Sequence, residues 1–340
     1  MLELKQGELV FTFPEIHPDA KLTVSLHRTL RIPDDGQTYP LPPSFGTFPL
    51  KHVDDYSATI PERWKQHGGL MFPMYQSEAL WIQFSSKYLS DHNSKYPFAV
   101  KIATGKINAI TGTAWNTDLS NRPQDYLVAP EQPWLDGYCV KKGLVRQFVA
   151  MPLGSGYSAE EQLTGKSEIG GLQIIVYPMK NSAFLKRFPE RRPFGTDMGD
   201  MLFQSAPSTC ESKPDMGIAP GGRMKQEIYE DPYDFDDWDL NVSNRCFIHS
   251  TNSLVWRGIT GEEPPTVPPT SKEYQLQGLP WFDYYGEQAL PVKGSGILNS
   301  MKSIFTLGGK KGGNPLPENE SVKVDSVVKI SKDQIREGDF

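Results

Sequence analysis

The sequence predicts a mainly β protein of packed antiparallel sheets, either a sandwich or a barrel-like form, with a few short peripheral helices. Three observations favour this class. Apolar and polar residues alternate over residues 21–32, as on a half-buried strand. Short apolar runs recur along the chain between segments rich in glycine, proline, asparagine and aspartate, which is typical of strands joined by turns. The 29 prolines are spread over 340 residues, which disfavours long helices.

The first long strand is expected at 21–32, and Arg28 is its exception because it falls on the apolar face. A buried, unpaired guanidinium is very costly, so Arg28 must bend away, reach a carboxylate or line a cavity. The other expected strands are short runs of apolar and β-branched residues, at 8–13, 69–76, 79–85, 98–105, 106–111, 125–130, 144–151, 171–178, 224–229 and 245–250.

Short helices are expected at 59–67, 181–188 and 269–279. Pro61 stands at a first helical position in the first of these, and the third has a Ser/Thr start and a glycine stop. Residues 189–223 are expected to form the longest irregular connection, since glycine, proline and polar residues predominate there.

The composition divides the chain into two regions. Residues 1–286 are expected to form a β-rich globular region, with a candidate subdomain boundary near 112–125. Residues 287–340 are rich in glycine, serine, lysine and glutamate and predict a flexible C-terminal tail. Two apolar pieces within it, at 296–305 and 322–330, are candidate docking segments for this chain or for a partner.

Charge and composition exclude several function classes. The net charge of −6 comes from scattered charges of both signs, which predicts neither nucleic acid nor membrane as a partner. No apolar run approaches the roughly 18 residues of a spanning helix, and the first residues lack a signal-peptide pattern. The three cysteines are widely spaced and suggest no disulfide framework. We therefore expect a cytoplasmic protein, and because no cofactor motif is present we expect no cofactor.

Residues 151–171 resemble a phosphate-binding loop at first sight, because Gly165, Lys166 and Ser167 follow a glycine-rich stretch. Such a loop needs glycine where this chain has Glu160, whose carboxylate would repel a phosphate. Gly170 and Gly171 would also end any helix after Ser167. The stretch is therefore interpreted as a polar connection between two strands.

An acidic segment at 230–241 is a weak candidate for a metal site. Its carboxylates are the oxygen ligands that hard cations prefer, and the candidate ligands are Asp231, Asp236, Asp237 and Asp239. The spacing does not match a calcium loop, because Val242 stands where glycine is required. A solvated acidic turn over packed aromatic side chains is the favoured interpretation. The six histidines are isolated in sequence and indicate no metal motif.

The segment 130–165 combines an apolar strand with long polar side chains that must be satisfied. These side chains either form a structural network or line the polar end of a ligand pocket. Together with Arg28 across the sheet, the candidate ligand-binding residues are Trp134, Asp136, Arg146, Gln147, Tyr157 and Gln162. Guanidinium and amide groups beside tryptophan would suit an anionic or sugar-like ligand. No nucleophile and base lie near each other in sequence, so the catalytic residues and the reaction are unknown.

Several long blocks carry a resemblance. They lie at 132–165 (QPWLDGYCVKKGLVRQFVAMPLGSGYSAEEQLTG), 170–178 (GGLQIIVYP), 216–239 (MGIAPGGRMKQEIYEDPYDFDDWD) and 278–285 (GLPWFDYY). These blocks resemble a family of uncharacterised proteins found in bacteria and some fungi, over most of residues 20–285. The resemblance implies no particular activity, cofactor or site residue. Asp234 stands where related sequences tend to carry glycine, which weakens a metal role for Asp234.

These observations favour a cytoplasmic binding or scaffolding protein that engages a protein partner or another copy of itself through the C-terminal segment. The alternative is a small-ligand-binding protein or an enzyme, with its pocket around Trp134, Asp136, Arg146 and Gln147.

Overall fold

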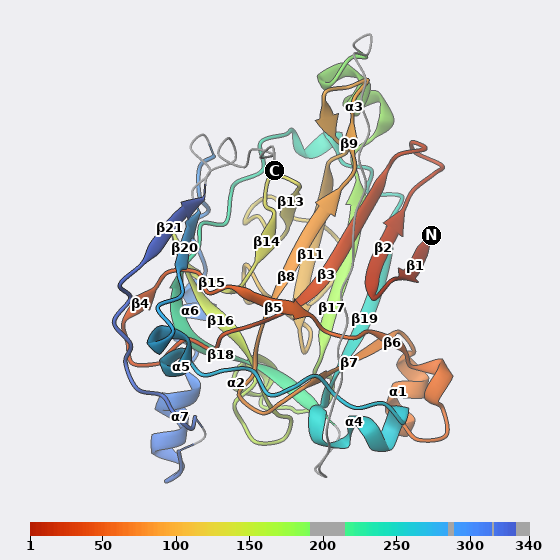
Figure 1. Ribbon diagram of the computed structural model, residues 1–340. Coiled ribbons are helices and arrows are strands. Elements are labelled where there is room, and N and C mark those ends of the chain that lie inside the picture. The colour runs from red at the N-terminus through yellow and green to blue at the C-terminus, as the bar shows by residue number, and fades with distance from the viewer. Residues whose placement is uncertain (191–214, 285–288, 315, 331–340) are drawn as a thin grey trace, which may run out of the picture.

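A computed structural model describes residues 1–190, 215–284, 289–314 and 316–330. Two large sheets dominate it, and nearly all their strand pairs are antiparallel. The sheets are open rather than closed into a barrel. The predicted class, mainly β with packed antiparallel sheets and a few short helices, is therefore confirmed in its open, sandwich-like form (Figure 1).

The larger sheet has ten strands, in the order β1-β2-β3-β8-β16-β18-β4, with β5 beside β3, β14 beside β8 and β15 beside β16. Only the short pairing between β18 and β4 is parallel. The strands are β1 (Leu2–Lys5), β2 (Glu8–Thr12), β3 (Lys21–Thr29), β4 (Thr38–Tyr39), β5 (Ser44–Thr47), β8 (Ala79–Ser86), β14 (Trp134–Leu135), β15 (Gly137–Lys141), β16 (Leu144–Pro152) and β18 (Met216–Lys225).

The second sheet has seven strands, in the order β12-β11-β17-β19-β7-β6, with β13 beside β11. Its one parallel pairing joins β19 to β7. The strands are β6 (Lys51–His52), β7 (Leu70–Met74), β11 (Phe98–Thr104), β12 (Ile107–Asn108), β13 (Leu127–Ala129), β17 (Leu172–Pro178) and β19 (Asn244–Asn252). Two small pairs complete the strands, β9 (Tyr88–Leu89) with β10 (Ser94–Lys95) and β20 (Trp281–Tyr284) with β21 (Val327–Ile330).

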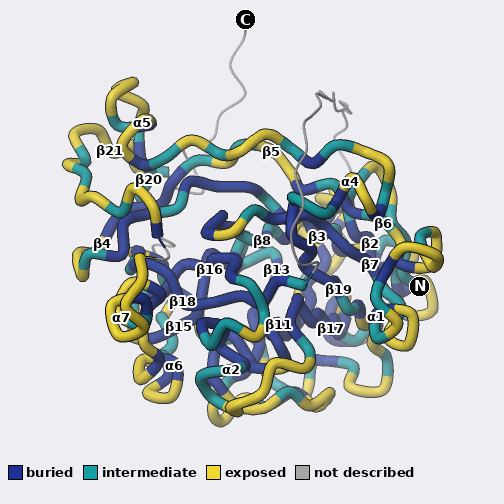
Figure 2. The backbone as a smooth tube through the Cα atoms, turned by 90° about the horizontal axis from the view of Figure 1, so that it is seen from below, coloured by how far each residue is buried: buried dark blue, intermediate teal, exposed yellow. Residues whose placement is uncertain are grey.

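Alternation decides which face of β3 is buried. Leu22, Val24 and Leu26 are at most 2% exposed, whereas Thr23 and His27 on the other face are partly exposed. By contrast, every residue of β11 and β17 is buried, because other parts of the protein cover both faces of these strands. A strand with two covered faces has no polar face, which explains their continuous apolar runs. Figure 2 shows burial concentrated along the strands and exposure in the outer loops and helices.

One hydrophobic core joins residues from Leu9 to Met301 and includes strands before and after residues 112–125. Both parts of the chain therefore share this core. The irregular connection was expected to extend to residue 223, but it ends earlier because β18 begins at Met216. The prediction overlooked this strand because proline and glycine interrupt its apolar pattern. Residues 191–214 lie outside the described residues.

The helices are short and lie at the edges of the sheets (Figure 1). They are α1 (Glu62–His67), α2 (Ala159–Thr164), α3 (Asn181–Arg187), α4 (Ser253–Thr260), α5 (Ser271–Leu276), α6 (Gly296–Ser300) and α7 (Ile304–Lys310), with 3-10 turns η1 (Asp54–Tyr56) and η2 (Phe235–Asp237). Helices α1, α3 and α5 fall in the predicted segments. Among the described residues, no helix is long and apolar enough to cross a membrane.

The described part of the C-terminal segment packs against the rest of the chain. Leu298 and Ile304 are fully buried, and Ser295 caps α6 while its hydroxyl donates to the Thr111 carbonyl. β21 pairs with β20. Both apolar pieces therefore contain an element that docks on this chain, so the segment is not a free tail where it is described.

Candidate functional site

Arg28 belongs to a buried ion pair. Its Nε and Nη2 atoms both lie 2.7 Å from Glu78 Oε1, and Nη2 also donates to the Thr266 carbonyl. Both side chains are at most 7% exposed. Of the three outcomes that its position allowed, Arg28 therefore reaches a carboxylate, and its Nε and Nη2 groups bond within the fold.

Asp136 and Gln147 are also satisfied internally. Gln226 donates to Asp136 Oδ2 at 2.7 Å, and its carbonyl accepts from the Asp136 backbone. Burial raises the pKa of Asp136 to about 7. The Gln147 amide bridges the backbone that follows β3, accepting from the Ile32 N–H and donating to the Leu30 carbonyl. These two candidates therefore act as structural bridges.

Tyr157 and Gln162 contact the C-terminal segment. The Gln162 amide donates to the Lys302 carbonyl at 3.0 Å and accepts from the Lys302 N–H at 2.8 Å. Lys311 Nζ lies 4.3 Å from the centre of the Tyr157 ring, within cation–π range. These side chains hold the segment that contains α6 and α7 against the body.

Trp134, in the larger sheet, packs among other partly exposed rings. Its ring centre is 4.7 Å from that of Tyr284 and 6.2 Å from that of Trp81, which stacks on His27 at 4.1 Å. Arg146 lies buried in β16. The seven sequence candidates thus occupy several separate environments and do not line one pocket.

Two cations, from α3 and its N-cap, contact the acidic segment. Arg187 forms ion pairs with Asp234 at 2.7 Å and Asp237 at 2.5 Å, and Lys180 donates to the Asp236 carbonyl. Asp239 accepts from the Asn241 N–H. No group of three or more potential metal ligands occurs within the residues that the structure describes.

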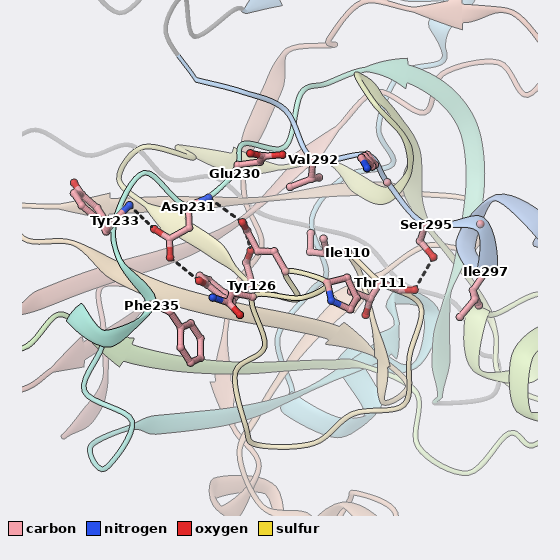
Figure 3. Close-up of a pocket in the computed structure, with 16 residues that line it drawn as sticks. Ile110, Thr111, Tyr126, Glu230, Asp231, Tyr233, Phe235, Val292, Ser295 and Ile297 are labelled. Carbon is pink, nitrogen blue, oxygen red and sulfur yellow. Dashed lines mark hydrogen bonds between the residues drawn. The ribbon is translucent and has the colours of Figure 1, made fainter.

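A cavity of about 900 Å³ is bounded by three segments far apart in the chain. They are the loops between β12 and β13, the start of the acidic segment, and the approach to α6 (Figure 3). Its lining residues are Ile110, Thr111, Asn121, Pro123, Gln124, Tyr126, Glu230, Asp231, Tyr233, Phe235, Val292, Lys293, Gly294, Ser295, Gly296 and Ile297.

Asp231 holds one wall of this pocket together (Figure 3). Its Oδ2 accepts from Tyr126 Oη at 2.5 Å and from Trp238 Nε1 at 2.7 Å, and its Oδ1 accepts from the Tyr233 N–H at 2.8 Å. The Asp231 N–H donates to Gln124. Burial raises the pKa of Asp231, and the pKa of Tyr126 is raised by burial and by this carboxylate. Asp231 therefore positions aromatic side chains instead of offering free oxygens.

The pocket combines aromatic walls with polar side chains at its rim. Tyr233 and Phe235 are partly exposed, whereas Asn121, Glu230 and Lys293 are exposed. The Tyr233 hydroxyl donates to Glu131, so its ring is fixed in place. The arrangement offers an apolar surface next to an amide, a carboxylate and an ammonium group.

Sequence reasoning identified one lining residue, Asp231, as a weak metal candidate. The aromatic residues of the acidic segment were predicted to pack against the body of the protein. Two of them, Tyr233 and Phe235, also line the pocket. Nothing in the local sequence around Asn121 or Lys293 indicates that they meet, because they approach only through the fold.

Comparison with protein-family models, with curated proteins and with solved structures found no match to this chain. The resemblance noted in the sequence blocks accordingly stays a prediction.

Proposed function

We propose that this is a cytoplasmic, non-catalytic binding protein that holds a small, hydroxylated ring compound of the sugar class in the pocket of Figure 3. The observation that carries the proposal is the pocket itself. Its volume of about 900 Å³ lies within the usual range for small-molecule sites, and it pairs apolar walls with a few polar groups. The buried thiols Cys139 and Cys246, which are free, are compatible with a reducing compartment.

The rim and wall match the two kinds of surface that a sugar ring presents. The rings of Tyr233 and Phe235 can pack against its C–H face, while Asn121, Glu230 and Lys293 supply both donors and acceptors for hydroxyl groups. The hydrogen bonds of Asp231 hold the aromatic wall before any ligand arrives, which reduces the entropic cost of binding.

Binding is favoured over catalysis because the hydroxyl groups of Ser295 and Thr111 and the carboxylate of Asp231 are already engaged. The Ser295 hydroxyl donates to the Thr111 carbonyl at 2.6 Å, and the Thr111 hydroxyl bonds that of Thr113. Asp231 accepts three hydrogen bonds. The lining residues include neither histidine nor cysteine, so this lining offers no imidazole base and no thiol nucleophile.

The test is titration calorimetry with a panel of mono- and disaccharides. Saturable binding should weaken roughly three- to tenfold in Phe235→Ala, because a ring contact contributes about 0.5–1.5 kcal/mol. Phe45→Ala is the matched control, since Phe45 is also partly exposed but lies in β5, away from the pocket. Binding that is absent for the whole panel, or that is equal in the two variants, would contradict the proposal.

A second candidate function, association with a protein partner or another copy, is favoured by β21. Val327 and Val328 are 43% and 44% exposed, and in the described chain β21 pairs with β20 alone. An exposed strand edge with apolar side chains is suited to strand addition. Val328→Lys should reduce self-association in light scattering, if that edge is used. Deletion of 291–340 is less suitable because it would remove the buried Leu298 and Ile304.

A further inference from the structure

Buried cations in this fold are usually matched by a carboxylate. Arg28 pairs with Glu78 at 2.7 Å, and Lys101 pairs with Asp125 at 2.7 Å, with every side chain at most 8% exposed. This is the expected arrangement, because an unpaired buried charge is very costly.

Arg146 departs from this arrangement. It is 8% exposed and forms no ion pair with any described residue. A guanidinium has five N–H donors, yet among the described residues Arg146 donates only to the Gly221 carbonyl, at 3.4 Å. Its Nε atom is buried with no hydrogen-bond partner there. Most of its donor capacity is therefore unused.

A second arginine lies directly opposite. Arg223 in β18 is the register partner of Arg146 in β16, which places the two side chains on the same face of the sheet, where like charges repel. Arg223 is partly exposed and donates to the Gly36 carbonyl at 3.2 Å. It has no ion pair in the parts of the chain described here, so the repulsion is not relieved at Arg223.

A third arginine, Arg31, lies in the segment that crosses these strands. The adjacent Ile32 N–H donates to Gln147 in β16, and the backbone at Pro33 closely approaches Gly222 in β18. Arg31 donates to the Pro317 carbonyl and to Asn319 Oδ1, both of which are uncharged acceptors.

Two acids influence these arginines. Asp34 raises the pKa of both Arg31 and Arg146, and Glu318 raises the pKa of Arg31, although burial lowers both pKa values more strongly. Asp34 is 6% exposed, and its Oδ2 accepts from the Phe305 N–H. The three guanidinium groups therefore outnumber these two carboxylates by one, which leaves a net positive charge at this corner of the sheet.

We infer that the corner formed by Arg31, Arg146 and Arg223 is a binding site for a phosphate-type oxyanion, separate from the pocket of Figure 3. A tetrahedral oxyanion would supply the missing negative charge and accept from the unused N–H groups. Arginine suits this role because its donors are arranged in a fork. The partly exposed Arg31 and Arg223 give the ion a route from solvent. None of the three arginines lines the pocket.

The test is titration calorimetry with inorganic phosphate at constant ionic strength, with chloride as the competing salt. The wild-type protein should show saturable binding. Arg223→Gln and Arg146→Met should each weaken it at least tenfold, whereas Arg245→Gln, a change of an exposed arginine on β19, should leave it within twofold.

Arg223 is partly exposed, so its variant keeps the test decisive if Arg146→Met fails to fold, and circular dichroism checks each variant. Phenyl phosphate serves as a second probe. Tighter binding of phenyl phosphate indicates a phosphate monoester as the ligand, and tighter binding of inorganic phosphate indicates the free ion. Absence of saturable binding of either probe, or binding that is unchanged in both variants, would overturn the inference.

Discussion

Glu160 occupies the position that a bound anion holds in a phosphate loop. Its Oε1 accepts from the N–H groups of Glu168 and Ile169 at 2.8 and 2.9 Å, and its Oε2 accepts from the Gly170 N–H at 2.8 Å. The residue is 3% exposed. Successive backbone N–H groups form an anion-binding concavity, and here the chain's own carboxylate fills it.

Glu160→Ala should therefore destabilise the fold by about 2–5 kcal/mol. The Gly170 N–H is buried, and an unsatisfied buried donor costs about 1–3 kcal/mol. Glu168 is exposed and Ile169 partly so, which lets water replace these bonds at about 0.5–1 kcal/mol each. Glu160→Gln should have an intermediate effect, because its amide retains one acceptor oxygen but turns a donor toward the remaining N–H groups.

Urea denaturation measures these differences as changes in the free energy of unfolding. Lys166→Ala is the control within the same loop: its side chain is 65% exposed, and the change should cost less than about 0.5 kcal/mol. Formate or acetate should partly restore the stability of Glu160→Ala by entering the vacated concavity. A cost for Glu160→Ala no larger than that for Lys166→Ala would refute this reasoning.

Three further predictions concern buried charge and backbone. Burial raises the pKa of Asp136 from 3.8 to about 7, so the folded state holds a proton that the unfolded chain releases. The free energy of unfolding should therefore fall as pH rises from about 4 to about 7, by at most about 4 kcal/mol. Asp136→Asn should flatten this slope in urea titrations at successive pH values. Gly171→Ala would place a Cβ 2.4 Å from a backbone oxygen at a φ of +54°, so it should lower the free energy of unfolding by more than about 2 kcal/mol. Gly165→Ala, at a φ of +73° with open space around it, should lower it by about 1 kcal/mol. Equal costs would show that the close approach at Gly171 does not matter. Asp125→Ala leaves Lys101 buried without its carboxylate and should cost about 3–5 kcal/mol, which thermal and urea unfolding would measure; a near-neutral effect would show that the pair is not needed.

Local patterns in the sequence were sufficient to predict the fold class. Alternation over 21–32 identified the buried face of β3, and turn residues separated most of the strands. The carboxylate partner of Arg28 was among the outcomes expected from its place on an apolar face. Helix α2 was overlooked although a local signal was present, since Ser158 and Glu161 form the capping box that begins it.

The pocket and the arginine corner were decided only by the tertiary structure. Asn121, Phe235 and Lys293 line one pocket although more than 100 residues separate the first two in sequence. Strand pairing places Arg146 opposite Arg223. Residue periodicity reports which face of an element is apolar, but not which distant element covers it. That choice depends on the free energy of packing and strand register summed over the whole core, so it is encoded in contacts that no local stretch of sequence contains.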